Sequence, residues 1–365
     1  MLQPLPQGLQ ARIVAAAVIS EVAGQGLSLD DRLAEGPAGR MHDLEPRDRA
    51  LVRSIATVAL RRLGTIRAAL GQFLDKGLPR KANQLEWLLT VGAAQLLYLD
   101  VPDHAAVDLA VHAARRDPRM QPYASLVNAV LRNVARARVE LIDHDDPFID
   151  TPPWLAARWR AHYGEEQARL IAFTNQCEPT LDLTVKGDAE KWAKELGGLV
   201  LPQGSVRLIE HTPIHELPGY DEGAWWVQDA AASLPARLLN AQSGETVLDL
   251  CAAPGGKTAQ LAITSAEVTA LDRSAERMKR LSANLERLHL SATIRVGDVL
   301  TFEAPQFDAI LLDAPCTATG TIRRHPDVAW IKRASDITSL ANVQSRMLDQ
   351  ALELLKPGGR LIYCT

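Results

Sequence analysis

Apolar residues in the first 140 positions of the chain recur three or four residues apart, which is helical spacing. The pattern predicts helices over Ala11 to Val22, Arg47 to Leu63, Gln84 to Tyr98, Ala105 to Arg116 and Ala124 to Ala137. In the last of these the inward positions are valine and leucine and the outward ones arginine: Val127, Val130, Leu131 and Val134 against Arg132, Arg136 and Arg138. Gln84 to Tyr98 is mostly apolar and should lie at the centre. We expect an all-α bundle.

The pattern changes after the acidic, proline-bearing stretch 143–153, which reads as a linker. A helix pair is predicted over 154–174. Strands are predicted over Thr180 to Val185 and Val206 to Ile209, with a helix over Ala189 to Leu196 between them. These elements predict a small α+β segment. The pair Trp225-Trp226 follows, and we favour packing at a domain junction over base stacking for it.

From Thr246 onward, short apolar runs alternate with helical segments, which is typical of a parallel, Rossmann-like α/β sheet. The predicted strands are Thr246 to Leu248, Val268 to Leu271, Ile294 to Gly297, Phe307 to Leu312 and Gly359 to Thr365. A helix over Leu340 to Leu355 and a turn over 356–359 precede the last strand. We therefore expect three regions, 1–142, 143–224 and 225–365.

The first of these strands runs into Asp249-Leu250-Cys251-Ala252-Ala253-Pro254-Gly255-Gly256-Lys257-Thr258. A strand, a small-residue loop and a helix together expose backbone N–H groups to a nucleotide-shaped ligand. A Walker A loop is excluded, because Cys251 stands where its first glycine should be. The dinucleotide fingerprint is excluded too, because the two glycines are adjacent.

Two more strands end in acids, Asp272 and Asp298. A carboxylate at the second strand end suits a ribose diol, and one at the third could accept from an adenine amino group. Three carboxylates would repel a pyrophosphate but suit a cationic nucleoside without phosphates. The predicted cofactor is S-adenosyl-L-methionine.

The fourth strand leads into Asp313-Ala314-Pro315-Cys316 and then Arg323-Arg324-His325-Pro326-Asp327. Over roughly the last 140 residues, the cofactor loop, the strand-end acids and this loop resemble the RNA cytosine-5 methyltransferases of the Nol/Nop/Sun type. The resemblance is greatest to the bacterial members that act on 16S ribosomal RNA. The helical segments RDRALV, VGAAQLLYLDVPDHAAV and SLVNAVLRNVAR resemble the NusB-type RNA-binding bundle that such enzymes carry.

The resemblance implies S-adenosylmethionine-dependent methylation of cytosine C5 through a cysteine adduct at C6. Asp313 would hold cytosine N3 protonated, and Cys316 would assist breakdown of the adduct. The implied cofactor-binding residues are Asp249, Cys251, Ala252, Ala253, Pro254, Gly255, Gly256, Lys257, Asp272, Arg277, Asp298 and Asp313. The segment 143–224 resembles the family's RNA-contacting subdomain, but Leu183-Thr184-Val185-Lys186 stands where an arginine-bearing strand is common.

The resemblance places the attacking thiol immediately after Thr365, the last residue of this sequence. Cys364 stands two positions earlier, about 6–7 Å back along a strand, which is too far to replace it. We therefore expect a carboxy-terminally incomplete catalytic core with its last strand as an exposed edge. A non-catalytic RNA-binding or assembly protein with a cofactor pocket is the alternative, and the codons after Thr365 distinguish the two. A protein or small-molecule methyltransferase is disfavoured by the Asp313-to-Cys316 loop.

Composition and charge indicate the cellular compartment and the binding partners to expect. The sequence begins with no basic and apolar leader and has no long apolar run, so secretion and membrane spanning are not expected. Its four cysteines have no metal-ligand spacing, which predicts no metal site and a reducing cytoplasm. Residues 1–140 carry 18 Lys and Arg against 14 Asp and Glu, whereas the remainder carries 22 against 30. The basic amino-terminal part is a weak indication of ribosomal RNA as partner. We expect a monomer.

Overall fold

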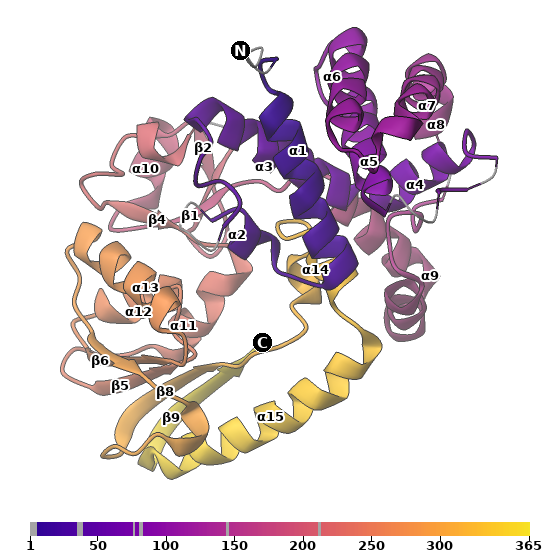
Figure 1. The fold of residues 1–365 in the computed structure, drawn as a ribbon. Coiled ribbons are helices and arrows are strands. Elements are labelled where there is room, and N and C mark those ends of the chain that lie inside the picture. Colours follow the sequence, from indigo (N-terminus) through magenta and orange to yellow (C-terminus); the bar gives the residue numbers. More distant parts are fainter. Residues whose placement is uncertain (1–5, 35–38, 76, 80–82, 144–145, 211–212) are drawn as a thin grey trace. The chain divides into compact units, whose positions relative to one another are not determined.

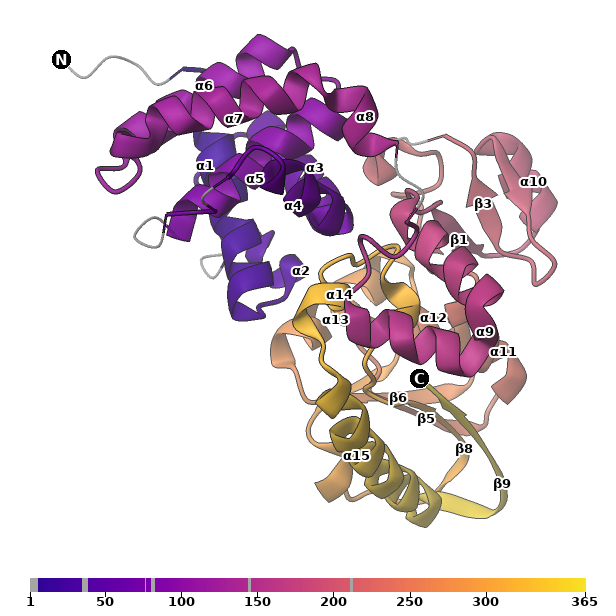
Figure 2. The same ribbon diagram turned by 90° about the vertical axis from the view of Figure 1, so that its right-hand side faces the viewer.

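The computed structural model describes residues 6–34, 39–75, 77–79, 83–143, 146–210 and 213–365. The chain forms two compact units (Figures 1 and 2). Unit 1 consists of Met1–Glu178 and Ala318–Asp336, and unit 2 of Pro179–Thr317 and Ile337–Thr365. The predicted three-way division stays a prediction, but its last region supplies residues to both units. Among the described residues, no helix is both long and apolar enough to cross a membrane.

Unit 1 is a helical bundle, as the apolar spacing predicted. Its helices are α1 (Leu9–Ile19), continued by a π-helical turn (Ser20–Gly24), α2 (Leu29–Arg32), α3 (Pro46–Arg61), α4 (Leu63–Gly71), α5 (Asn83–Tyr98), α6 (Asp103–Arg116), α7 (Ala124–Arg136), α8 (Arg138–Ile142) and α9 (Pro153–Gln176). Helix α5 contacts α1, α3, α4, α6 and α7, which confirms its central place. Helix α9 changes direction at Gly164, where φ is 79°, so it is the expected helix pair.

The contact between α5 and α7 shows why the bundle is close-packed. All four predicted inward residues of α7 are buried, and its Arg132 and Arg136 are exposed. A Cβ on Gly92 of α5 would lie 2.5 Å from the Leu131 side chain. Only glycine therefore allows the two helices this separation.

Unit 2 begins with a small antiparallel sheet of order β2-β3-β1-β4. Its elements are β1 (Asp182–Val185), α10 (Ala189–Glu195), β2 (Gly198–Val200), β3 (Val206–Leu208) and β4 (Trp225–Val227). The expected boundary before Trp225 falls inside this sheet, since β4 pairs with β1. Trp225 and Trp226 are buried, which confirms packing over base stacking.

The second sheet of unit 2 is parallel throughout, with order β7-β6-β5-β8-β9. Its strands are β5 (Thr246–Leu250), β6 (Glu267–Asp272), β7 (Thr293–Val296), β8 (Phe307–Asp313) and β9 (Leu355–Cys364), and its helices are α11 (Leu234–Leu239), α12 (Gly256–Ala262) and α13 (Ala275–Arg287). Helix α15 (Ala334–Glu353) precedes β9. Central β5 and β8 are apolar because both faces are covered. The Rossmann-like prediction is confirmed.

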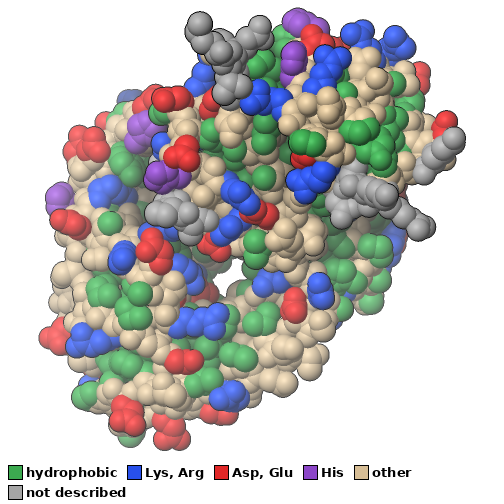
Figure 3. Space-filling model, viewed as in Figure 1, with side chains coloured by type: hydrophobic (Ala, Val, Ile, Leu, Met, Phe, Trp, Pro, Cys, Tyr) green, Lys and Arg blue, Asp and Glu red, His purple; other side chains and the backbone are tan. Residues whose placement is uncertain are grey.

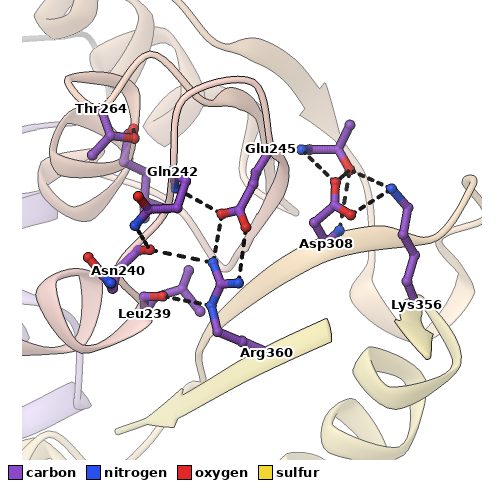
Figure 4. Close-up of polar contacts among 10 residues, drawn as sticks. Leu239, Asn240, Gln242, Glu245, Thr264, Asp308, Lys356 and Arg360 are labelled. Atoms are coloured by element: carbon purple, nitrogen blue, oxygen red, sulfur yellow. Dashed lines mark hydrogen bonds and ion pairs between the residues drawn. The ribbon is translucent and has the colours of Figure 1, made fainter. Parts of the chain in front are cut away.

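Strand β9 is an edge of this sheet and is fixed at its start by charged groups (Figure 4). The predicted turn at 356–359 is a bulge within the strand, because Phe307 pairs with Leu355 but Ala309 with Arg360. Lys356 Nζ lies 2.8 Å from Asp308 Oδ1, and hydrogen bonds from Lys356 and Thr246 hold the pKa of Asp308 well below its usual range. Arg360 donates to Glu245 and to the carbonyl groups of Leu239 and Asn240.

Candidate functional site

The predicted cofactor loop joins β5 to α12 at the carboxyl end of the sheet. Its close turn requires glycine at 255, where φ is 103° and a Cβ would lie 2.7 Å from Leu281. The Ala252 N–H donates to the carbonyl of Leu271, 3.0 Å away, so the loop also lies against β6. Because Gly255 and Gly256 have no side chains, the loop presents its backbone at this end of the sheet.

Asp272, at the end of β6, organises both neighbouring loops. Its Oδ1 accepts from the Ser274 N–H at 2.9 Å, and its Oδ2 accepts from the Ala253 N–H at 3.3 Å. Arg277 lies 3.5 Å from the same carboxylate and also donates to the carbonyl of Ala253. A carboxylate held by three donors is fixed in orientation, as recognition of a diol requires.

Asp249 is fully buried at the end of β5. Its Oδ2 accepts from the Thr258 hydroxyl at 2.6 Å, whereas its Oδ1 has no partner among the described residues. Burial, and to a smaller extent the nearby Asp313, raises the pKa of Asp249 to about 7. An unpartnered buried carboxylate oxygen suits a cationic or hydrogen-bond-donating group. S-adenosylmethionine carries both an ammonium and a sulfonium group, so the residues fit this cofactor.

Asp313, at the end of β8, connects the cofactor loop to the predicted catalytic loop. Its Oδ2 lies 2.7 Å from Lys257 Nζ, and its Oδ1 lies 3.5 Å from the Sγ of Cys364. Pro315, in the loop before Cys316, accepts from the Gln344 amide of α15 at 2.9 Å. The site is thus built from the ends of β5, β6, β8 and β9, where open parallel sheets bind ligands.

The cysteines near this site differ in environment. Burial raises the pKa of Cys251 and of Cys364 to about 12, so both are protonated thiols at neutral pH. The thiolate is the nucleophilic form of cysteine. Neither residue is therefore prepared for attack in this state. Cys316 is half-buried in the loop that follows Asp313.

Asp298 lies apart from the buried acids. It is exposed after β7, and its carboxylate caps the short 3₁₀ turn Val299–Thr301 by accepting from the Leu300 N–H at 2.9 Å. This capping accounts for an aspartate here without a ligand. Its role toward adenine stays a prediction, as do the roles of the other site residues.

Sequence reasoning missed the polar residues that support the loop from the small sheet. Gln228 accepts from the Thr184 hydroxyl at 2.7 Å and from the Trp226 indole at 3.0 Å. Its amide donates to Gln260 of α12 at 2.7 Å, and a Cβ on Gly256 would lie 3.5 Å from it. A lone glutamine carries no motif, so only the structure identifies this link.

The raised pKa of Asp249 predicts how the stability of unit 2 depends on pH. The folded state keeps the proton up to pH about 7, whereas the unfolded chain releases it near 3.8. The folded state therefore binds more protons in this interval, and the free energy of unfolding falls as pH rises, by at most about 1.4 kcal/mol per pH unit. In Asp249→Asn this slope should disappear. Urea unfolding of both proteins at pH 5 and 7.5 measures this slope. An equal decrease in the free energy of unfolding of the two proteins would contradict the raised pKa of Asp249.

Comparison with known proteins agrees with this geometry. Residues 236–365 match the family described as 16S rRNA methyltransferase RsmB/F, and residues 9–136 match the NusB family. The chain is 37% identical to ribosomal RNA small subunit methyltransferase B of Vibrio vulnificus over 379 residues, covering 98% of this chain and 87% of the relative. The corresponding protein of Cronobacter sakazakii is also 37% identical, with 99% and 87% covered.

Solved structures show the same folds. The crystal structure titled PH0851 superposes with a TM-score of 0.71 at 22% identity, covering 99% of this chain and 86% of that one. A methyltransferase homologue from Pyrococcus horikoshii gives a TM-score of 0.51 at 30% identity, covering 57% and 72%. The sequence relatives extend over nearly the whole chain and carry both of its domain types. This chain therefore belongs to the ribosomal RNA small subunit methyltransferase B family of S-adenosylmethionine-dependent enzymes.

Proposed function

We propose that the protein methylates C5 of a cytosine in 16S ribosomal RNA, using the site at the ends of β5, β6 and β8. The observation that supports this most is the hydrogen-bonded series of Asp249 with Thr258, and Lys257 with Asp313, directly before the loop of Cys316. It combines a buried carboxylate for a cationic cofactor with an acid and a thiol for a pyrimidine. The relatives at 37% identity are named as methyltransferases of small-subunit ribosomal RNA.

In this proposal the cofactor supplies the methyl group, and the protein's residues prepare the cytosine. Asp313 accepts from protonated N3, which withdraws electrons from C6. A thiolate then adds to C6, and the electron pair of the C5–C6 bond becomes available at C5 for the methyl carbon. A base removes the C5 proton, and the thiol leaves as the double bond re-forms. Lys257, 2.7 Å from Asp313, orients that carboxylate.

We assign the thiols of the site different roles. Cys316 assists elimination, and the attacking thiol is the one that the family resemblance expects after Thr365. The raised pKa of Cys364 supports leaving it out of the attack. Its contact with Asp313 at 3.5 Å suits a residue that helps to orient the acid.

We propose that the helical bundle contacts the RNA backbone and that the protein acts as a monomer in the cytoplasm. Its four cysteines have no spacing typical of a disulfide framework, which suits a reducing compartment. On the face shown in Figure 3, Lys and Arg side chains lie among Asp and Glu side chains over the bundle. On this face, an RNA contact would then depend on individual Lys and Arg side chains rather than on a broad basic field.

Methyl transfer and RNA binding test this proposal separately. The unmutated protein, expressed from its whole gene, should transfer labelled methyl groups to 16S ribosomal RNA at cytosine, read by bisulfite sequencing. Replacing exposed Arg132 and Arg136 with glutamine should lower RNA affinity and reduce the salt slope of log K by about 0.7–0.9 for each lost phosphate contact. Exposed Lys279 and Arg295 of unit 2, replaced likewise, are the control. An unchanged slope in the α7 variant would remove α7 from the RNA interface.

A further inference from the structure

Residues 318–336, here called the docking segment, follow the loop of Cys316 in sequence but belong to unit 1. The segment contains the Arg323-to-Asp327 motif, to which the proposed function assigns nothing. It includes the 3₁₀ turn Thr319–Thr321 and helix α14 (Val328–Ile331), which contacts the π-helical turn Ser20–Gly24 of the bundle (Figure 1). The chain thus passes from unit 2 to unit 1 between Thr317 and Ala318, and the docking segment is attached to the bundle.

Asp327 makes the most specific of these attachments. Its side chain is buried, and its Oδ2 accepts from the backbone N–H of Leu29, 3.0 Å away and 298 residues earlier in the chain. Its Oδ1 has no partner among the described residues, and burial raises the pKa of the carboxyl. A buried carboxylate with an unsatisfied oxygen is a costly way to hold two elements together. An apolar side chain would serve stability better, whereas the carboxylate fixes position.

Trp330 makes a second attachment, three residues further along. Its indole N–H donates to the carbonyl of Leu60 in α3 at 2.7 Å, and its ring lies 6.0 Å from the guanidinium of Arg67. Arg61 donates to the carbonyl of Arg323 at 3.2 Å. These hydrogen bonds tie the segment to the end of α3.

An apolar contact completes the attachment. Ile322, Val328 and Ala329 of the docking segment share a buried cluster with residues of α9, among them Leu155, Trp159 and Ala172. Three directional hydrogen bonds and an apolar cluster together hold the segment in one position on the bundle.

We propose that Asp327 and Trp330 are positioning residues: by fastening the docking segment to the bundle, they restrain the loop that carries Cys316 from its carboxyl side. Cys316 is two residues before the segment, and on the amino side the loop is held by Asp313 of β8 and by Gln344 through Pro315. Attachment on both sides of the loop leaves it fewer conformations that compete with the one in which the thiol reacts at C6 of cytosine. This inference rests on the proposed role of Cys316.

The test compares Asp327→Ala with Asp327→Asn, in the protein expressed from its whole gene. The asparagine retains an oxygen that can accept from Leu29, so it should rescue function. Asp327→Ala should lower kcat by about 10- to 100-fold, as expected for a reacting group displaced by ~1 Å. KM for RNA and the cofactor Kd should change less than threefold. Trp330→Phe, which loses only the indole donor, should lower kcat in the same direction.

Two further measurements separate positioning from stability. Hydrogen exchange at Leu29 reports the attachment, and alkylation of Cys316 by N-ethylmaleimide, measured by peptide mass spectrometry, reports the loop. Both rates should rise in Asp327→Ala and stay near the unmutated values in Asp327→Asn. Asp336→Ala is the control, because Asp336 makes a local contact to the Arg333 N–H in the same segment.

The proposal is overturned if Asp327→Ala loses the protection of Leu29 but keeps the kcat and alkylation rate of the control. It is also overturned if the asparagine variant loses as much as the alanine variant. Should the unmutated protein form no 5-methylcytosine, the proposed function fails, and the alkylation rates still decide whether the attachment restrains the Cys316 loop.

Discussion

Cys316→Ala is expected to stop turnover and to leave the protein covalently attached to its RNA. If Cys316 assists elimination, the first thiol still adds to C6 and the methyl group is still transferred, but the adduct breaks down slowly. Turnover should fall by roughly 10²- to 10⁴-fold, the range for a lost proton-transfer group. Denaturing gel electrophoresis with labelled RNA detects the adduct in the protein expressed from its whole gene.

Two controls identify the attacking thiol. The cysteine expected after Thr365, replaced by alanine, should abolish both the adduct and 5-methylcytosine. Cys364→Ala should retain the adduct in the Cys316→Ala background, because the pKa of Cys364 is raised to about 12 and its thiol stays protonated. The 365-residue chain alone should form no 5-methylcytosine. If it does, and Cys364→Ala eliminates that product, Cys364 is the nucleophile and the strand-position argument is wrong.

The parallel sheet could be predicted because each of its strands is a short apolar run that ends at a chemically distinctive residue. Asp249, Asp272 and Asp313 follow buried strands, and the carboxyl ends of parallel strands share one edge. The bundle could be predicted equally well, because the helical spacing of apolar residues in α7 identifies its buried face. Local pattern and tertiary structure agree at these places.

Other features depend on contacts between distant residues, which no local pattern encodes. The pairing of β4 with β1 places Trp225 in the small sheet, although the sequence suggested that it opens the catalytic region. Asp327 is part of a polar motif in the sequence, and its burial against Leu29 is seen only in the structure. Asp298 shows the opposite case. The sequence predicted a contact of this strand-end acid with adenine, whereas its carboxylate accepts from the nearby Leu300 N–H in the structure.

The acid with the largest expected effect on cofactor affinity is Asp272. In Asp272→Ala, the affinity for S-adenosylmethionine should fall by about 10- to 100-fold, which corresponds to the loss of one or two charge-assisted hydrogen bonds. Part of this loss comes from the loop itself, because Asp272 also accepts from Ala253 at 3.3 Å and lies 3.5 Å from Arg277. Isothermal titration calorimetry with the cofactor and with its demethylated product measures the change.

The matched control for this variant is Ser274→Ala. Ser274 accepts from the Arg277 N–H at 3.2 Å and caps α13, so its loss should cost about 1 kcal/mol of stability without removing the carboxylate. Cofactor affinity should then stay within twofold of the unmutated protein. Asp272→Asn distinguishes charge from shape, since the amide keeps one acceptor oxygen but cannot accept from both ribose hydroxyls. If Asp272→Ala binds the cofactor as tightly as the unmutated chain, the ribose does not lie at the end of β6 and the pocket is misassigned.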